Sequence, residues 1–280
     1  MLCSYMYKMK LFTRNMTIFK CYYHYRRHSH TLINYTEYPF HEPNSSAYQS
    51  LVKRCRQSFK TTGCCYLPNF ISNKTLETIL NEITEWLNKY GDRVFHSYEL
   101  HNLHLQETTN TDEEQQKSSK TVIAYDQIPT TSLLHQIYQY NPLTEFIRQI
   151  TTPETKLYRS RDEMGAMYVN IYEKGNQLNW HYDNSHFFVN LLLKQPSDEG
   201  IFEYKIQNDK IISRNDFEAR GLTIFHGSQY RHRVTEIKSP KKERINAIFT
   251  YATISDHKLN DYIHKKFFGR IQKWDINDEY

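Results

Sequence analysis

The chain has 280 residues, 39% of them hydrophobic and 15% aromatic, which is enough to bury a core in one domain with appendages. No stretch approaches the run of about 18 apolar residues that a membrane-spanning helix needs, so no transmembrane helix is predicted. The five cysteines form no Cys-x-x-Cys pair and none follows Cys65, which argues against a disulfide scaffold or zinc finger and favours a reducing compartment.

The net charge of +5 comes from the start of the chain. Residues 1–36 contain six Lys and Arg residues and no Asp or Glu, so the remainder carries a net charge of −1. A basic, acid-free leader is typical of an organellar transit peptide; a disordered start and a nucleic-acid-binding arm are the alternatives. We therefore expect residues 1–40 to be a disordered or targeting arm. The protein is then cytoplasmic, or mitochondrial if residues 1–36 act as a transit peptide.

The first half of the body has helical periodicity. Apolar residues recur on one face over residues 44–62 and 73–90, each preceded by a serine that can cap the helix and followed by a glycine that can end it. A short strand is expected at 64–67, and helical patterns return at about 131–151. Residues 106–120 contain no apolar residue, so we interpret them as a flexible insertion or a lid.

Strands are expected from residue 156 onward. In residues 167–172, apolar residues alternate with residues that carry hydroxyl or amide groups, which places the two sets on opposite faces of a strand. Residues 186–193 are almost wholly apolar and favour a buried strand. Further strands are expected at 201–206, 221–225, 231–237 and 244–253. This arrangement predicts a mainly β protein with flanking helices, folded as a double-stranded β-helix, or jelly roll, of the cupin-like kind.

The most informative motif is a set of three candidate metal ligands. His181 and Asp183 are two residues apart, so an extended strand places both on one side, and His232 must come from another strand. Two imidazoles and one carboxylate on one face of an ion, with the other positions open, are the ligand set of non-haem Fe(II) oxygenases. The alternative is a chance His-x-Asp among 14 histidines. We reject His226 as the distal ligand because of its spacing from Arg244.

Arg244 is the candidate for binding the carboxylate of a keto-acid co-substrate, because a buried guanidinium can contact a carboxylate through two parallel hydrogen bonds. Asn246 lies two residues on, on the same strand face. Asn170 and Tyr172, on the polar face of a strand that leads to the His-x-Asp motif, are further candidates for cofactor binding. The alternatives are a surface arginine and ordinary polar sheet residues.

Candidate substrate contacts rest on weaker signals. Glu203 and Asp162 are acidic groups near the expected site that could hold a substrate amine, or equally form structural salt bridges. Trp180, beside His181, is a third candidate. The histidines at positions 96, 101 and 104 lie on an expected loop and are either solvated or face the substrate.

These motifs together resemble the Fe(II)/2-oxoglutarate-dependent dioxygenase superfamily, in the branch that includes free-amino-acid hydroxylases and radical halogenases. The resemblance covers roughly residues 45–253 and rests on Asn179–Asn184 and on segments 125–129, 202–204, 225–227 and 232–235. It implies that His181, Asp183 and His232 bind Fe(II), that Arg244 binds 2-oxoglutarate, and that O2 is consumed with ascorbate in support. The sequence departs from relatives in a short segment between Glu203 and Gly221, and in Asn246, where a serine is common.

The resemblance gives residues 41–255 as the dioxygenase domain, with support helices over 44–151 and a jelly-roll core over 156–253, before a helical tail over 256–280. We expect an oxidoreductase that hydroxylates an aliphatic C–H of a small amino-acid-like substrate and releases succinate and CO2. Asp183 favours hydroxylation, because Gly or Ala there would admit a halide. The alternatives are a non-catalytic cupin-like binding protein and an oxygenase acting on protein or nucleic acid. No membrane partner is expected, and the oligomeric state is left open.

Overall fold

A computed structural model describes residues 32–97, 118–183 and 185–271. Its helices are α2 (Ser46–Thr62), α3 (Asn73–Tyr90), α4 (Leu133–Tyr138), α5 (Asn141–Thr151) and α6 (Asp261–Phe268). Its strands are β1 (Cys64–Leu67), β2 (Phe95–Ser97), β3 (Lys120–Ile123), β4 (Tyr158–Arg159), β5 (Met167–Tyr172), β6 (Leu178–His181), β7 (Phe188–Lys194), β8 (Phe202–Lys205), β9 (Ile211–Ser213), β10 (Leu222–Phe225), β11 (His232–Val234), β12 (Arg244–Phe249) and β13 (Tyr251–Ala252).

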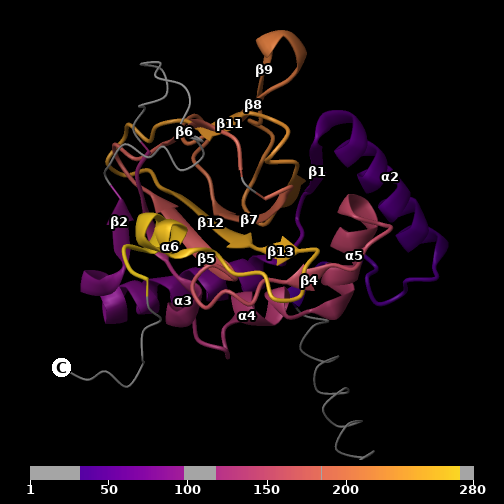
Figure 1. The fold of residues 1–280 in the computed structure, drawn as a ribbon, viewed down its shortest axis with the longest axis horizontal. Helices are drawn as coiled ribbons and strands as arrows, with labels where there is room; N and C mark the ends of the chain where they lie inside the picture. Colours follow the sequence, from indigo (N-terminus) through magenta and orange to yellow (C-terminus); the bar gives the residue numbers. More distant parts are fainter. Residues whose placement is uncertain (1–31, 98–117, 184, 272–280) are drawn as a thin grey trace, which may run out of the picture.

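The strands form two main antiparallel sheets. The larger sheet has seven strands in the order β1-β10-β7-β12-β5-β3-β2, and the smaller has four in the order β6-β11-β8-β9. Figure 1 shows the smaller sheet above the larger one, with α3 and α4 below, and β4 and β13 form a separate two-stranded pair. Strands adjacent in space are often distant in sequence. This confirms the expected mainly β jelly roll with flanking helices.

The first two helices form where the capping signals predict them. The Ser45 side chain accepts a hydrogen bond from the backbone N–H of Tyr48, and Ser72 does the same for Thr75. Gly63 ends α2 in the left-handed conformation, at φ 70°. The pattern over 131–151 forms two helices rather than one, because Pro142 lacks the N–H that a continuous helix would bond there.

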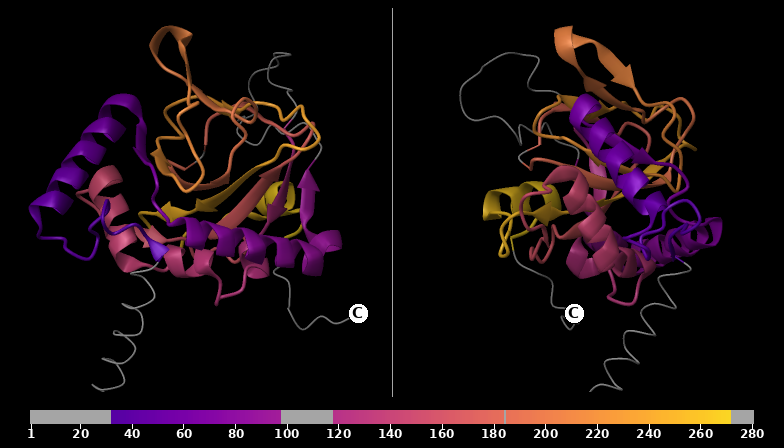
Figure 2. Two further views of the ribbon diagram at one scale, coloured as in Figure 1. Left: turned by 180° about the vertical axis from the view of Figure 1, so that it is seen from behind. Right: turned by 90° about the vertical axis from the view of Figure 1, so that its right-hand side faces the viewer.

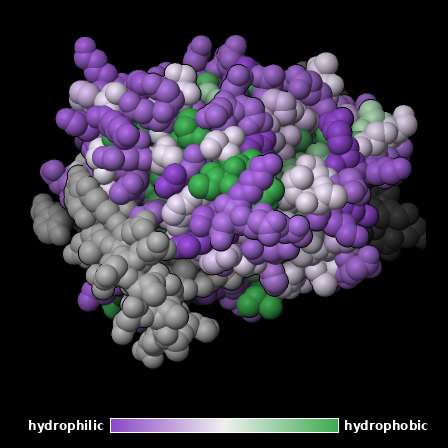
Figure 3. Space-filling view, turned by 90° about the horizontal axis from the view of Figure 1, so that it is seen from above, coloured by the Kyte–Doolittle hydropathy of each residue, from purple (hydrophilic) through white to green (hydrophobic). Residues whose placement is uncertain are grey.

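Helices α2, α3, α4 and α5 cover one face of the seven-stranded sheet (Figure 2), whereas α6 lines the cavity on the other face. The main core lies between these four helices and the sheet, where buried side chains of α2, α3 and α5 pack against alternate residues of the sheet, including Val169, Ile171, Val189, Leu191 and Ala247. The intervening residues of the same strands point to the other face, toward the four-stranded sheet. Seen from the four-stranded side, the surface is mostly hydrophilic, with small hydrophobic areas (Figure 3).

Several expectations from the sequence concern residues at or beyond the ends of the described segments. The expected loop over 106–120 ends early, because Ser119 bridges to Gln177 and Lys120 opens β3; residues 106–117 lie outside the described residues. Residues 1–31 of the basic arm and 272–280 of the C-terminal tail also lie outside them, whereas α6 lies within the tail. No helix in the described segments is long and apolar enough to cross a membrane. The cysteines among them, Cys55, Cys64 and Cys65, are buried free thiols.

Candidate metal centre

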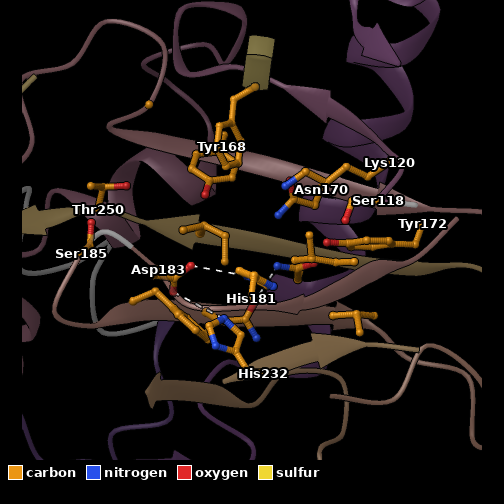
Figure 4. A pocket seen from close by; sticks show the side chains of 18 of the residues that line it. Ser118, Lys120, Tyr168, Asn170, Tyr172, His181, Asp183, Ser185, His232 and Thr250 are labelled. Atoms are coloured by element: carbon orange, nitrogen blue, oxygen red, sulfur yellow. Dashed lines mark hydrogen bonds and ion pairs between the residues drawn. The ribbon is translucent and has the colours of Figure 1, made fainter. Parts of the chain in front are cut away.

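Two neighbouring strands of the smaller sheet bring the three candidate ligands together. His181 ends β6 and His232 begins β11, and these two residues face each other in the antiparallel register. The Asp183 carboxylate lies between the rings, with Oδ1 3.5 Å from His181 Nε2 and Oδ2 3.5 Å from His232 Nε2 (Figure 4). One ligand atom from each residue falls within 4.8 Å of the other two. Among the described residues, His181, Asp183 and His232 are the group of His, Cys, Asp or Glu side chains that could hold a metal ion.

Backbone carbonyls fix both imidazole rings in the orientation that metal binding needs. His181 Nδ1 lies 2.6 Å from the carbonyl oxygen of Asn179, and His232 Nδ1 lies 2.9 Å from that of Tyr230. A carbonyl can only accept, so each Nδ1 carries the proton and donates it, and each Nε2 keeps a lone pair directed at the cluster. Two neutral imidazoles and one carboxylate, so oriented, fit a divalent iron with open positions for further ligands.

The third ligand depends on a glycine in the loop between β10 and β11. Asp183 follows the end of β6 rather than lying within it, and its backbone N–H donates to the carbonyl oxygen of Gly227 at 3.0 Å. A Cβ atom at position 227 would lie 2.0 Å from Asp183 Oδ2. The carboxylate can therefore occupy its place only because residue 227 has no side chain. His226, the neighbouring histidine that the spacing argued against, lies outside the cluster and stacks on Phe59.

The cluster opens into a cavity of about 180 Å³ between the two sheets. A row of polar side chains crosses the cavity face of the larger sheet, from β5 through β12 and β7 to β10: Asn170, Asn246, Asn190 and Thr223. Asn170 pairs with Asn246, and Asn190 with Thr223, whereas Asn190 lies diagonally from Asn246 because its register partner on β12 is Ile248. Asn246 Nδ2 donates to Asn190 Oδ1 at 2.6 Å, whereas Asn170 Oδ1 and Thr223 Oγ1 are buried without a hydrogen-bond partner. Buried polar atoms are rarely left unpaired, so these two indicate that a ligand supplies the missing bonds.

Arg244 lies at the end of this row, opposite Tyr172 in the register between β12 and β5. Its Nη1 donates to Gln195 Oε1 and, at 3.1 Å, to the carbonyl oxygen of Gly200. Its Nε is buried without a partner, and Nη2 has no hydrogen bond with a described residue. Nε and Nη2 form the edge of a guanidinium that binds a carboxylate through two parallel bonds. Burial lowers the pKa of Arg244 to about 10, so it keeps its charge at neutral pH.

The structure places the four expected cofactor-binding residues, Asn170, Tyr172, Arg244 and Asn246, in the cavity lining. Tyr172 is almost fully buried, and burial raises its pKa, so its hydroxyl is protonated and can donate. The orphaned atoms of Asn170 and Arg244 therefore give this part of the cavity the chemistry of a carboxylate-binding pocket. These residues fit the polar end of a keto acid.

The three expected substrate contacts lie outside the cavity lining. Glu203 is on the other face of β8, where it pairs with Arg233 at 2.7 Å and accepts from Ser213. The Trp180 ring lies under the guanidinium of Arg233, with 4.6 Å between guanidinium and ring centroid. Both residues thus belong to a polar layer on the outer face of the smaller sheet. Side chains alternate along β8, so Glu203 points away from the cavity that Phe202 lines. In β6 a register shift opposite His232 and Val234 breaks the alternation, so that Leu178 and His181 both line the cavity and Trp180 does not.

Asp162 is structural as well. Its buried carboxylate accepts the backbone N–H groups of Met164, Gly165 and Leu259 and lies 2.7 Å from His264 Nε2. These bonds tie the segment that leads into α6 to the body of the protein and leave no room for a substrate amine. His96 is exposed and bonds to Thr121 at 2.6 Å, and positions 101 and 104 lie outside the described residues.

Two lysines and α6, which falls in the expected helical tail over 256–280, line the cavity although the sequence did not predict a role for them there. Lys120 lines the cavity from the first position of β3, and Lys266 lines it from α6 together with Ile263, Phe267 and Phe268. The signal for Lys120 was available in the sequence, because it opens the β-prone run Lys120–Ile123 and shares a face with Val122. No sequence signal places α6 over the cavity, since its position depends on tertiary contacts.

Comparisons with known proteins agree with this geometry. A crystal structure of an oxidoreductase of the 2OG-Fe(II) oxygenase family from Burkholderia pseudomallei is 12% identical, with a TM-score of 0.53 over 73% of this chain and 92% of that one. A prolyl hydroxylase from Trichoplax adhaerens, in complex with a hypoxia-inducible-factor peptide, is 13% identical, with a TM-score of 0.51 over 76% and 96%. The carbocyclase SnoK of nogalamycin biosynthesis is 12% identical, with a TM-score of 0.52 over 80% and 94%.

At these identities the likeness establishes the fold, which is the jelly roll of the 2-oxoglutarate oxygenases. No curated protein matches the chain. The profile of the family described as Halogenase D matches residues 47–204, more than half of the chain, and this range includes β5 and the His181-x-Asp183 motif. The chain therefore belongs to the Halogenase D family, within the Fe(II)/2-oxoglutarate-dependent oxygenase fold that the sequence motifs indicated.

Proposed function

We propose that this protein is an Fe(II)- and 2-oxoglutarate-dependent dioxygenase that hydroxylates an aliphatic C–H bond of a small organic substrate. The observation that carries the proposal is the convergence of His181, Asp183 and His232 at the mouth of a cavity that ends at a buried arginine. A site built only for structure would satisfy its buried polar atoms, and this one leaves Arg244 Nε, Asn170 Oδ1 and Thr223 Oγ1 unpaired.

Each residue then has a definite task. His181, Asp183 and His232 hold Fe(II), which supplies the activation of dioxygen when it is bound. Arg244 holds the far carboxylate of 2-oxoglutarate through its free edge, and its bonds to Gln195 and Gly200 keep that edge in place. The surrounding sheets exclude bulk water, so the substrate C–H is presented to the metal in a fixed geometry.

Asp183 supports hydroxylation rather than halogenation, although the family is described as Halogenase D. Its carboxylate occupies the third position on the metal-binding face, where an exchangeable halide would otherwise have room. Gly227 reinforces this arrangement, because the space it leaves is filled by Asp183 Oδ2. The products we expect are the hydroxylated substrate, succinate and CO2.

A direct test uses purified protein with Fe(II), ascorbate and 2-oxoglutarate, first without and then with panels of free amino acids, other organic acids, peptides and cell extract. Succinate formation establishes the co-substrate, and mass spectrometry detects a product with one added oxygen atom. Chloride is included in parallel, and no chlorinated product is expected. Iron-loaded protein that binds 2-oxoglutarate but never forms succinate would support the non-catalytic alternative instead.

A further inference from the structure

The charges around the cavity are unbalanced in favour of cations. Among the described residues that line it, Arg244, Lys120 and Lys266 are basic and Asp183 is the one acid. Asp183 is already committed to the proposed iron, whose own charge adds to the excess. Oxoglutarate, a dianion, neutralises Arg244 and part of the metal charge. The two lysines are left facing a cavity that contains no other acid from the described chain.

The ammonium of Lys120 lies away from Arg244. Lys120 begins β3, next to the pair of Thr121 and Ile171 in the register with β5, but its Nζ lies over the rings of Tyr168 and Phe267. Tyr168 pairs with Ile248 of β12, four residues along that strand from Arg244. Figure 4 shows Lys120 across the cavity from the cluster of His181, Asp183 and His232. This is the part of the cavity in which a substrate has to lie for its C–H to reach the metal.

The ammonium of Lys120 has no polar partner there. It forms no hydrogen bond or ion pair with a described residue, and it lies over the rings of Phe267, at 4.9 Å to the centroid, and Tyr168, at 5.7 Å. Burial lowers the pKa of Lys120 to about 8, with Asp183 opposing the shift. A lysine kept in an aromatic enclosure without an acidic partner is costly unless a ligand supplies the counter-charge.

The wall beside Lys120 is apolar and belongs to α6. Phe267, Phe268 and Ile263 of this helix and Leu259 before it line the cavity. Asp162 holds the segment through Leu259 and His264, and Asp126 binds both Nη atoms of Arg270 at 2.6 and 2.7 Å just beyond the helix. The aromatic wall is thus fixed in position, and it offers a surface for an apolar group next to the unpaired ammonium.

We propose that the substrate is an organic anion: an apolar chain or ring that carries a carboxylate or a phosphate, with the anionic group on Lys120 Nζ and the apolar body against Phe267 and Phe268. Lys266 adds a second positive charge from the same helix. A substrate with a terminal amine would need a carboxylate of the protein to bind that amine. Such substrates are disfavoured, because Glu203 and Asp162 are engaged elsewhere. This inference rests on the proposed oxygenase function, because the iron and 2-oxoglutarate define which part of the cavity the substrate enters.

The test measures binding rather than turnover. Protein loaded with Fe(II) and 2-oxoglutarate under anaerobic conditions is titrated with three six-carbon probes, hexanoate, hexyl phosphate and hexylammonium, and the unfolding midpoint and calorimetric Kd are recorded. We expect at least one anion to raise the midpoint and hexylammonium to leave it unchanged, and the better anion identifies the group. Lys120→Met should weaken binding of the preferred anion by roughly tenfold or more, since it removes a charge-assisted hydrogen bond. Lys120→Arg should bind that anion with nearly the affinity of the wild type.

Lys265→Met, at an exposed position of the same helix, is the matched control and should bind the anions as the wild type does. Binding of 2-oxoglutarate is measured separately and should be unchanged in Lys120→Met. The inference would be overturned if hexylammonium bound more tightly than both anions, or if no probe bound. It would also be overturned if Lys120→Met and Lys265→Met lost anion affinity equally. A loss of 2-oxoglutarate binding in Lys120→Met would reassign Lys120 to the co-substrate. A wild type that binds no 2-oxoglutarate would instead contradict the proposed function itself.

Discussion

The two faces of the seven-stranded sheet differ sharply, although they are made by the same strands. On β5, Val169 and Ile171 point into the core under the helices, whereas Asn170 and Tyr172 point into the cavity. The core face is apolar and tightly buried. The cavity face carries a polar row, a buried guanidinium and three buried polar atoms without partners.

The difference separates the residues that stabilise the fold from those that bind ligands. Burying an apolar side chain stabilises the folded state by about 1.5–3 kcal/mol, whereas a buried polar atom without a partner costs about 1–3 kcal/mol. The core face therefore provides the stability that the cavity face gives up. Substitutions in the core should therefore change mainly the free energy of unfolding, and those on the cavity face mainly activity or ligand binding. Four substitutions test that separation.

The largest effect is expected in the core that the sheet forms with the helices. Phe146 of α5 is fully buried and packs against Phe40, with 4.7 Å between ring centroids. Phe146→Ala should lower the free energy of unfolding by about 3–5 kcal/mol, because it removes buried apolar surface and leaves a cavity. Chemical denaturation measures the loss. The KM for 2-oxoglutarate, measured at a temperature where the variant is folded, should not change, and a large change would break the separation.

The metal cluster should give the largest effect on activity. Asp183→Ala removes the carboxylate that approaches both histidines, so succinate formation should fall by more than about 100-fold and the stabilisation by added Fe(II) should be lost. Asp198→Ala, at an exposed aspartate that pairs with Lys242, is the control and should retain both. Full activity in Asp183→Ala would exclude this residue as a ligand.

A smaller effect is expected at the co-substrate end. Arg244→Lys keeps the charge but loses the two-pronged edge, so the KM for 2-oxoglutarate should rise by roughly tenfold, with a smaller change in kcat. Arg233→Lys changes an arginine that pairs with Glu203 on the outer face of the smaller sheet, and its KM should match the wild type. Equal KM values in the two variants would place the keto acid elsewhere.

The smallest and most discriminating effect concerns Thr223. Its hydroxyl is buried without a partner, so Thr223→Val should raise the free energy of unfolding of the ligand-free protein by about 1 kcal/mol. The same change should weaken 2-oxoglutarate or substrate binding. In Thr121→Val the lost hydroxyl has a partner, His96, so stability should not rise. If Thr223→Val is both less stable and fully active, the orphaned atoms of the cavity face are not reserved for ligands.

The sequence by itself determined the iron-site motif, the capped helices α2 and α3 and the mainly β architecture. These follow from local rules: a two-residue spacing places His181 and Asp183 together, and serine before an apolar periodicity starts a helix. It also placed Arg244 and Asn246 on one face of a strand, in the cavity lining where the structure has them.

Only the tertiary structure decided which polar residues face the cavity. Glu203 and Trp180 each follow or precede a cavity residue on their strands, and a single sequence shows neither which face is inside nor the register shift in β6. Lys120, Gly227 and α6 reach the site from segments far apart in the chain, through strand pairing and the anchoring of α6 by Asp162 and Asp126. Such contacts depend on how the sheets and helices pack in three dimensions, which local spacing does not encode.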